Sequence, residues 1–249
     1  MRIEETIADL ERVAAREVGR GSEALAAPAA GGLLAAARSL AAAGAPDAAV
    51  FTGFFIPGAE PPAAETDGPL GAVQIAAALR LLGGRCRLVT DEPCAPVVEA
   101  AVAAAAPGLP VDVAPLRGYE DWAAALLPEY ARLTHLIACE RVGPGVDGRP
   151  RNMRGEDIGA HTAPLDRLGG TSNWAAAALV GALSLLRPEV PELRALLAPA
   201  WSYDLLTAIV RAGAVDGVRR RPTLSVDGLD WPAYAEPLTE IAELVRAGR

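Results

Sequence analysis

The sequence predicts an α/β protein with a doubly wound, mainly parallel sheet, helices on both faces and a helix-rich C-terminal part. From residue 46 onward, short apolar runs alternate with helical segments, which is the pattern of a parallel sheet covered on both faces. The chain is 51% hydrophobic but only 4% aromatic, so its core must consist mainly of Ala, Leu and Val. Packed layers of helix and sheet suit such a composition.

The length suits one large domain over residues 1–249, since a domain typically takes about 100–200 residues. We expect N-terminal helices over residues 1–45 and the core over residues 46–230. Apolar residues recur at helical spacing between Ile3 and Val13, which predicts an amphipathic helix over the first 19 residues. A second helix should end near Gly44.

Four apolar runs are the candidate strands, and three helical segments separate them. The runs cover residues 48–52, 85–90, 110–113 and 135–139, and the helical segments cover residues 70–82, 95–106 and 119–132. The C-terminal part should contain helices over residues 174–186, 192–197, 202–212 and 234–247, with one or two strands within residues 215–226.

Composition argues against several classes of function. The net charge of −8 and the pI near 4.9 oppose nucleic-acid binding, which needs a concentrated basic surface. No apolar run reaches the ~18 charge-free residues of a membrane span, and the charged N-terminus does not resemble a signal peptide. The three cysteines lack the spacing of a disulfide framework or a zinc site. We therefore expect a cytoplasmic protein without a metal; whether identical chains associate stays open.

The ends of the predicted strands select the candidate ligand site. In an open parallel sheet, ligands bind outside the carboxyl ends of the strands, where loops converge and helix N-termini present unpaired N–H groups. This rule selects residues 52–53, 65–68, 90–92 and 140–157. We expect Asp67, Asp91 and Glu140 to lie at the same edge of the sheet.

An arginine loop over residues 140–157 is the least ordinary of these segments. It is about 18 residues long, and connections of that length are usually functional or disordered. Four arginines interleave with four carboxylates, and an arginine fork suits carboxylate recognition. A solvated surface loop with ordinary ion pairs is the alternative.

Other candidate positions also have ordinary explanations. Thr66 or Asp67 would suit the N-cap of the following helix, and Asp91 would suit the N-cap of the next one. The segment over residues 169–174 leads into a helix and could present N–H groups to an anion. His135 is expected to be structural, and His161 and Cys139 are weaker candidates for a reactive group.

Several segments are distinctive when taken together and in order. They are ETDGP (residues 65–69) with Gly71, VTDE (89–92), Glu140-Arg141 followed by Gly143 and Asp147-Gly148, NMRG (152–155) with Asp157-Ile158, SNW (172–174), and DGV (216–218) through VDGL (226–229). Over residues 48–230 the chain thereby resembles the D-glutamate cyclase C-terminal domain family. The ETDGP turn and the NMRG stretch are the most specific of these motifs.

The resemblance implies a hydro-lyase that converts D-glutamate to 5-oxo-D-proline by intramolecular lactam formation, with a small amino-dicarboxylic acid as substrate and no organic cofactor. Ring closure needs a base for the α-amine, an acid for the departing hydroxide and fixed donors for the oxyanion. Asp67 and Glu140 are the candidate base and acid, in either order. Further substrate-binding candidates are Thr66, Gly68, Asp91, Arg141, Asn152, Arg154, Gly155, Asp157, Ser172 and Asn173. Arg141 and Arg154 would clamp carboxylates, and N–H groups around Gly68, Gly155 and Gly170 would bind the oxyanion.

This chain is a short form of the family pattern. A Gly-rich GDGGNEIGMG-like stretch is absent between Ile158 and Ser172, and Ala175 follows Trp174 where the family pattern has Gly. A non-catalytic domain that retains a crevice for small carboxylates is therefore the alternative function. Nucleotide binding is a third possibility, but no GxGxxG motif follows the first predicted strand.

Overall fold

The chain folds around a four-stranded parallel sheet. A computed structural model describes residues 2–17, 27–165 and 173–248. The strand order is β5-β4-β1-β6, and every neighbouring pair runs parallel. The strands are β1 (Asp47–Gly53), β4 (Arg85–Asp91), β5 (Val111–Ala114) and β6 (His135–Arg141). The predicted α/β sheet is confirmed, since each predicted run lies within two residues of the observed strand at both ends.

Helices make up most of the rest of the described chain. They are α1 (Ile3–Ala14), α3 (Gly32–Ala42), α4 (Pro69–Leu81), α5 (Ala95–Ala105), α6 (Tyr119–Tyr130), α7 (Asn173–Leu186), α8 (Pro199–Arg211) and α9 (Trp231–Ala247), with 3-10 turns η1 (Ala27–Ala29), η2 (Gly159–His161) and η4 (Pro191–Leu197). Two small antiparallel hairpins complete the fold: β2 (Phe55–Ile56) with β3 (Ala63–Ala64), and β7 (Ser225–Val226) with β8 (Leu229–Asp230).

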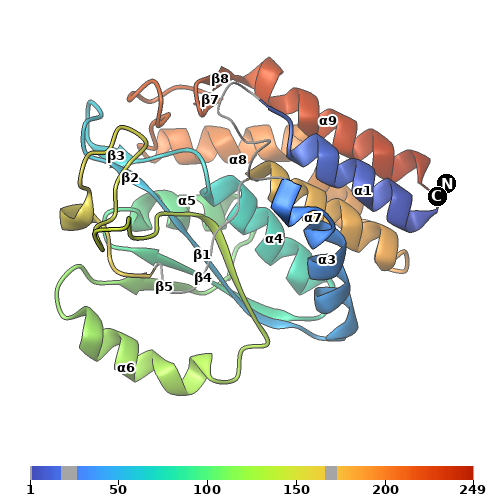
Figure 1. Cartoon of the computed structure of the whole chain (residues 1–249), viewed down its shortest axis with the longest axis horizontal. Coiled ribbons are helices and arrows are strands. Elements are labelled where there is room, and N and C mark those ends of the chain that lie inside the picture. Colours follow the sequence, from blue (N-terminus) through green and yellow to red (C-terminus); the bar gives the residue numbers. More distant parts are fainter. Residues whose placement is uncertain (1, 18–26, 166–172, 249) are drawn as a thin grey trace.

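The two faces of the sheet are covered unequally. Val50 and Leu88 point into the main core, which contains residues of α4, α5, α7, α8 and α9. Phe51 and Val89 alternate to the other face, where Tyr119 and other residues of α6 pack on them. Figure 1 shows α6 on the opposite side of the sheet from α4 and α7. The predicted helices on both faces are confirmed, and one face carries most of them.

Helix α7 is the centre of the helical layer. Its Ala-rich sequence lets α1, α3, α4 and α9 all pack against it. At Gly181 a Cβ would lie 3.1 Å from a Val245 methyl group and 3.2 Å from a Leu10 methyl group, so α7 touches the first and last helices at one point. The helices α1 and α9 consequently lie side by side (Figure 1).

Several predicted bounds differ from the structure. The first helix ends at Ala14 instead of residue 19, directly after its last buried apolar residue, Val13. The strands expected within residues 215–226 are the short hairpin β7-β8, which reaches residue 230. No single helix in the described ranges is long and apolar enough to cross a membrane, whereas η4 and α8 pass that test only together, across a bend of 57°.

The position of α7 can be tested by truncating one of its core side chains. Leu183 is fully buried, so Leu183→Ala should lower the free energy of unfolding by about 2–5 kcal/mol. Leu127 on α6 is 64% exposed, so Leu127→Ala should change it by less than ~0.5 kcal/mol. Urea denaturation measures both values. Equal losses would contradict the arrangement of helices described above.

Candidate functional site

The carboxyl ends of β1, β4 and β6 meet at one edge of the sheet. Asp91 is the last residue of β4, and Glu140 is the last but one of β6. Asp67 lies in the turn between β3 and α4, and Glu140 lies close enough for its charge to act on the Asp67 carboxyl. The prediction that Asp67, Asp91 and Glu140 share one edge is confirmed.

Gly68 allows the turn to lie directly against the sheet. Its φ of 95° is in the left-handed region that favours glycine. A Cβ at this position would lie 2.7 Å from Thr52 Oγ1 and 2.8 Å from Glu140 Cβ. Any side chain here would therefore push the Asp67 turn away from the strand ends.

A β-bulge aims the Glu140 side chain. The pairing of β1 with β6 is regular up to Thr52 and Cys139, and the next pair is Gly53 with Arg141. Glu140 is thus an extra residue in β6, and its φ of 49° is left-handed, which a residue with a Cβ rarely adopts. A bulge re-aims a side chain that a regular strand would turn elsewhere.

Four carboxyl groups form a cluster around the Asp67 turn. Asp67 is only 6% exposed, its Oδ1 accepts a hydrogen bond of 3.0 Å from the Gly68 N–H, and its carboxyl also shares a side-chain hydrogen bond with Asp227. Glu65 and Glu140 lie near enough to act on it by charge. Within the described ranges, no group of three or more His, Cys, Asp or Glu side chains is arranged to hold a metal ion.

The cluster changes the acidity of Asp67. Burial, followed by the negative charges of Glu140, Asp227 and Glu65, raises the pKa of the Asp67 carboxyl well above its usual range. The hydrogen bond with Asp227 acts in the same direction. This edge of the sheet therefore holds a carboxyl group that favours its protonated form.

The predicted capping roles of these residues are wrong. Helix α4 takes Gly68 as its N-cap and α5 takes Cys94, and in this described region neither cap is completed by a side-chain hydrogen bond. Thr66 instead donates its hydroxyl to the Ser225 carbonyl. The carboxyl of Asp91 is bound by an arginine.

Arg141 and Asp91 form a buried ion pair. The distance between Arg141 Nη1 and Asp91 Oδ2 is 2.7 Å, and both side chains are 1% exposed. Arg141 also donates to the carbonyl oxygens of Gly53, at 2.9 Å, and of Ala163. Its guanidinium therefore joins the ends of three strands instead of presenting an open face to a substrate carboxylate.

The arginine loop is a compact hairpin held by exposed ion pairs. Arg149 binds Asp157 at 3.2 Å, and Arg151 binds Asp147 at 2.6 Å. For these arginines the structure matches the alternative of ordinary surface ion pairs. Asp157 also accepts the Gly159 N–H, so its carboxyl is used to shape the loop.

Asn152 organises the tip of this loop. Its Oδ1 accepts the backbone N–H groups of Arg154 and Glu156, each at 3.0 Å, and Gly155 donates its N–H to the Asn152 carbonyl. The N–H groups of both Gly68 and Gly155 are thus donated within the chain. Their predicted role toward an oxyanion stays a prediction.

Arg154 differs from the other loop arginines. It makes no ion pair with any residue that the structure describes, and its guanidinium donates to the Val218 carbonyl at 3.3 Å. Glu156 binds Arg220 of the same C-terminal segment at 3.2 Å. These contacts bring the loop to the segment that carries Asp227.

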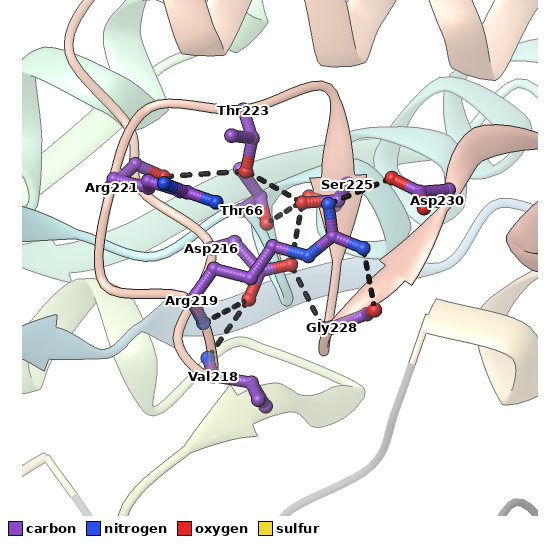
Figure 2. A network of polar contacts seen from close by, with 9 residues as sticks. All are labelled: Thr66, Asp216, Val218, Arg219, Arg221, Thr223, Ser225, Gly228 and Asp230. Carbon is purple, nitrogen blue, oxygen red and sulfur yellow. Dashed lines mark hydrogen bonds and ion pairs between the residues drawn. The ribbon is translucent and has the colours of Figure 1, made fainter.

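Asp216 organises that C-terminal segment, and the sequence analysis assigned it no role. It is fully buried, and its two oxygens accept four hydrogen bonds (Figure 2). The donors are the N–H groups of Val218, Arg219 and Gly228 and the hydroxyl of Ser225, at 2.7–2.9 Å. The signal that could have revealed this hairpin is the pair Asp227-Gly228, a typical tight-turn sequence.

Three predicted residues lie in or next to the segment 166–172, which is outside the described ranges. Ser172 and Gly170 are outside the described residues, and Asn173 is the first residue of α7.

His135 lies at the opposite end of β6, where it contacts Ser39 at 3.0 Å, as expected of a structural residue. Cys139 is fully buried, and burial raises the pKa of its thiol, which opposes a role as nucleophile.

A cavity of about 470 Å³ lies at the other edge of the sheet, near the amino ends of the strands. Arg85 and Arg87 line it, but Arg85 is bound to Asp47, and Arg87 is bound to Asp112 and Glu129. These two of its four arginines are thus already neutralised. We place the candidate site at the carboxyl edge because the buried carboxyl and the bulge are there.

Comparison with known proteins gives one family. The family model described as D-glutamate cyclase-like, C-terminal, matches residues 10–169 and 168–242. These ranges include the Asp67 turn, the bulge, the arginine loop and the hairpin β7-β8. No curated protein matches the chain significantly.

The ion pair between Arg141 and Asp91 should stabilise the fold. Arg141→Met leaves a buried carboxylate without its partner, so the free energy of unfolding should fall by about 3–5 kcal/mol. The double variant with Asp91→Asn should recover part of this loss. Arg149 is 65% exposed, so Arg149→Met should cost less than ~1 kcal/mol. Chemical denaturation tests all three, and an unchanged stability of Arg141→Met would contradict the structural role.

Asp67 should make stability fall as the pH rises. The Asp67 carboxyl has a higher pKa in the folded state than in the unfolded state, so the folded state binds the proton more tightly. Its contribution to the free energy of unfolding is therefore lost as the pH rises from the unfolded pKa, about 3.9, through the raised folded pKa. Asp67→Asn should therefore stabilise the protein at about pH 8 relative to about pH 4.

Asp147 provides a control of opposite sign. A hydrogen bond from Arg151 lowers the pKa of the Asp147 carboxyl, so its contribution is present at neutral pH and is lost on acidification. Asp147→Asn should lower the melting temperature at neutral pH and have less effect in acid. Parallel pH dependence in both variants would refute the raised pKa of Asp67.

Proposed function

The chain belongs to the D-glutamate cyclase-like C-terminal family, and from this premise we propose that it converts D-glutamate to 5-oxo-D-proline by intramolecular lactam formation. The observation that supports this proposal best is the buried Asp67 carboxyl beside Glu140. The Asp67 carboxyl favours its protonated form, whereas Glu140 is half-buried and reaches solvent. Such a pair supplies an acid and a base at one place.

The substrate needs both kinds of group. Its α-ammonium must lose a proton before the nitrogen can attack, and its γ-carboxylate must gain protons before an oxygen can leave as water. A cluster of carboxylates attracts the ammonium group. A protonated carboxyl can donate a hydrogen bond to the γ-carboxylate, which an ionised one cannot. We therefore assign Glu140 as the base and Asp67 as the acid.

The protons balance in this scheme. Glu140 takes one proton from the ammonium, and Asp67 gives its proton to a γ-carboxylate oxygen as the C–N bond forms. The nitrogen of the tetrahedral intermediate then returns a proton to Asp67. The protonated Glu140 gives its proton to the departing hydroxyl, the C–O bond breaks, and water leaves. Both side chains end in their initial states, and no cofactor is required.

Arg154 is the residue that we assign to the α-carboxylate. Arg141 is used by Asp91, whereas Arg154 reaches across to Val218, next to the Gly217 backbone that lies against Glu65. A cation there would offset the repulsion between a dicarboxylate and the acidic cluster. The three cysteines are all buried and form no disulfide, which suits activity in the reducing cytoplasm.

A binding domain without turnover is the second candidate. The observation that favours it is the missing Gly-rich stretch between Ile158 and Ser172. Loss of an anion cradle would weaken transition-state stabilisation more than ground-state binding. The chain would then hold a small amino-dicarboxylic acid and release it unchanged.

Incubation of the purified protein with D-glutamate should form 5-oxoproline without added nucleotide, as followed by chiral chromatography. Asp67→Asn and Glu140→Gln should each lower kcat by about 10²–10⁴-fold, the range for loss of a general acid or base. L-Glutamate should react more slowly than D-glutamate.

Asp147→Asn serves as the control, since it removes an exposed carboxylate from the far part of the arginine loop. Its turnover should match that of the wild type. Calorimetry separates the two candidate functions: D-glutamate binding without lactam above the spontaneous rate would exclude the cyclase and leave the binding domain.

A further inference from the structure

On the basis of the proposed function, we propose that Asp227 is a further catalytic residue, which shares with Asp67 the proton that is delivered to the γ-carboxylate of the substrate. The relevant elements are the Asp67 turn and the hairpin β7-β8. They are far apart in sequence and are fastened together in the structure.

Two hydrogen bonds of Thr66 hold the turn against the C-terminal segment. The Thr66 hydroxyl donates to the Ser225 carbonyl at 2.9 Å, and the Thr66 N–H donates to the Val215 carbonyl at 2.8 Å. Figure 2 shows Thr66 beside the network around Asp216. Since Thr66 precedes Asp67 directly, and Ser225 lies two residues before Asp227, these bonds bring together the backbone segments that carry the two carboxyl groups.

The turn of the hairpin does not itself need a carboxylate. Asp227 and Gly228 have φ of 56° and 79°, as both central residues of a type I′ turn do. Asn-Gly serves this turn as well as Asp-Gly. The Gly228 N–H is bound by Asp216 at 2.8 Å, so the backbone of the turn is held independently of the Asp227 side chain.

The hydrogen bond between Asp67 and Asp227 requires a proton. Two ionised carboxylates are acceptors only, so a hydrogen bond between them exists only when one carries a hydrogen. The negative charge of the neighbouring carboxylate favours the protonated form of Asp67. The direction of the pKa of Asp67 agrees with this arrangement.

The side chains of Asp67 and Asp227 differ in solvent exposure, so we assign them different roles. Asp67 is 6% exposed, whereas Asp227 is half-buried and therefore in partial contact with solvent. Asp227 is thus the member through which a proton from water can reach the pair. Glu140 is also half-buried, so the proposed base has its own access to solvent.

A proton shared by Asp67 and Asp227 also explains why the nitrogen of the tetrahedral intermediate returns a proton to this pair. When the pair gives its proton to the γ-carboxylate oxygen, two negative charges are left in contact, which is unfavourable. The pair then takes up a proton from the nitrogen of the tetrahedral intermediate. One proton leaves and one returns, so the balance of the reaction is unchanged.

The experiment compares Asp227→Asn with Asp230→Asn, a matched change in the same hairpin at an exposed residue. Asp227→Asn removes the charge and the hydrogen bond that raise the pKa of Asp67. The alkaline limb of the kcat/KM profile for D-glutamate should therefore move to lower pH, and kcat at neutral pH should fall by about 10²-fold. Asp230→Asn should leave both unchanged. An unmoved alkaline limb in Asp227→Asn would overturn the proposal.

Infrared difference spectroscopy tests the shared proton without substrate. The wild type should show a protonated carboxyl band that disappears at high pH, and Asp67→Asn should lack it. In Asp227→Asn the band should disappear at lower pH than in the wild type; an identical titration overturns sharing even if lactam is formed. If the band shifts but the wild type makes no lactam, the proposed function fails and the proton pair stands.

Discussion

A buried ion pair at the ends of three strands is the constraint on which the site depends. Removing Arg141 and Asp91 from water costs several kcal/mol per ion, and only close contact with each other and further hydrogen bonds offset that cost. Arg141 is therefore held in one position. Its neighbour Glu140 lies in the left-handed bulge, directly beside the Gly68 turn. The proposed base thus follows directly from a strand end that the ion pair holds in place.

The sheet and its edge were predictable from the sequence, because they depend on local patterns. Apolar runs of four to seven residues between helices indicate parallel strands, and the known geometry of such sheets selects their carboxyl ends. The bulge was not predictable, since nothing in Cys139-Glu140-Arg141 signals an extra residue. The burial of Arg141 was not predictable either, because arginine is rarely buried without a partner that only the fold supplies.

The role of the C-terminal hairpin was hidden for another reason. Its strands are two residues long, which is too short for an alternating pattern. Asp216 and Asp227 each resemble an ordinary turn residue, and only their contacts distinguish them. The arginine loop shows the reverse: its composition suggested an anion site, whereas most of its charges bind one another. A pattern of charges in one segment is a weak guide where the partners lie elsewhere.

The tie between Thr66 and Ser225 spans 159 residues of chain. Closing so long a loop has a high entropic cost, so such contacts form late in folding, after local helices and strands. During synthesis the Asp67 turn and the bulge leave the ribosome well before the hairpin β7-β8. A C-terminally truncated chain therefore lacks the residues that complete the carboxyl pair, together with the core residues of α9. Assembly of the site is thereby coupled to synthesis of the hairpin β7-β8.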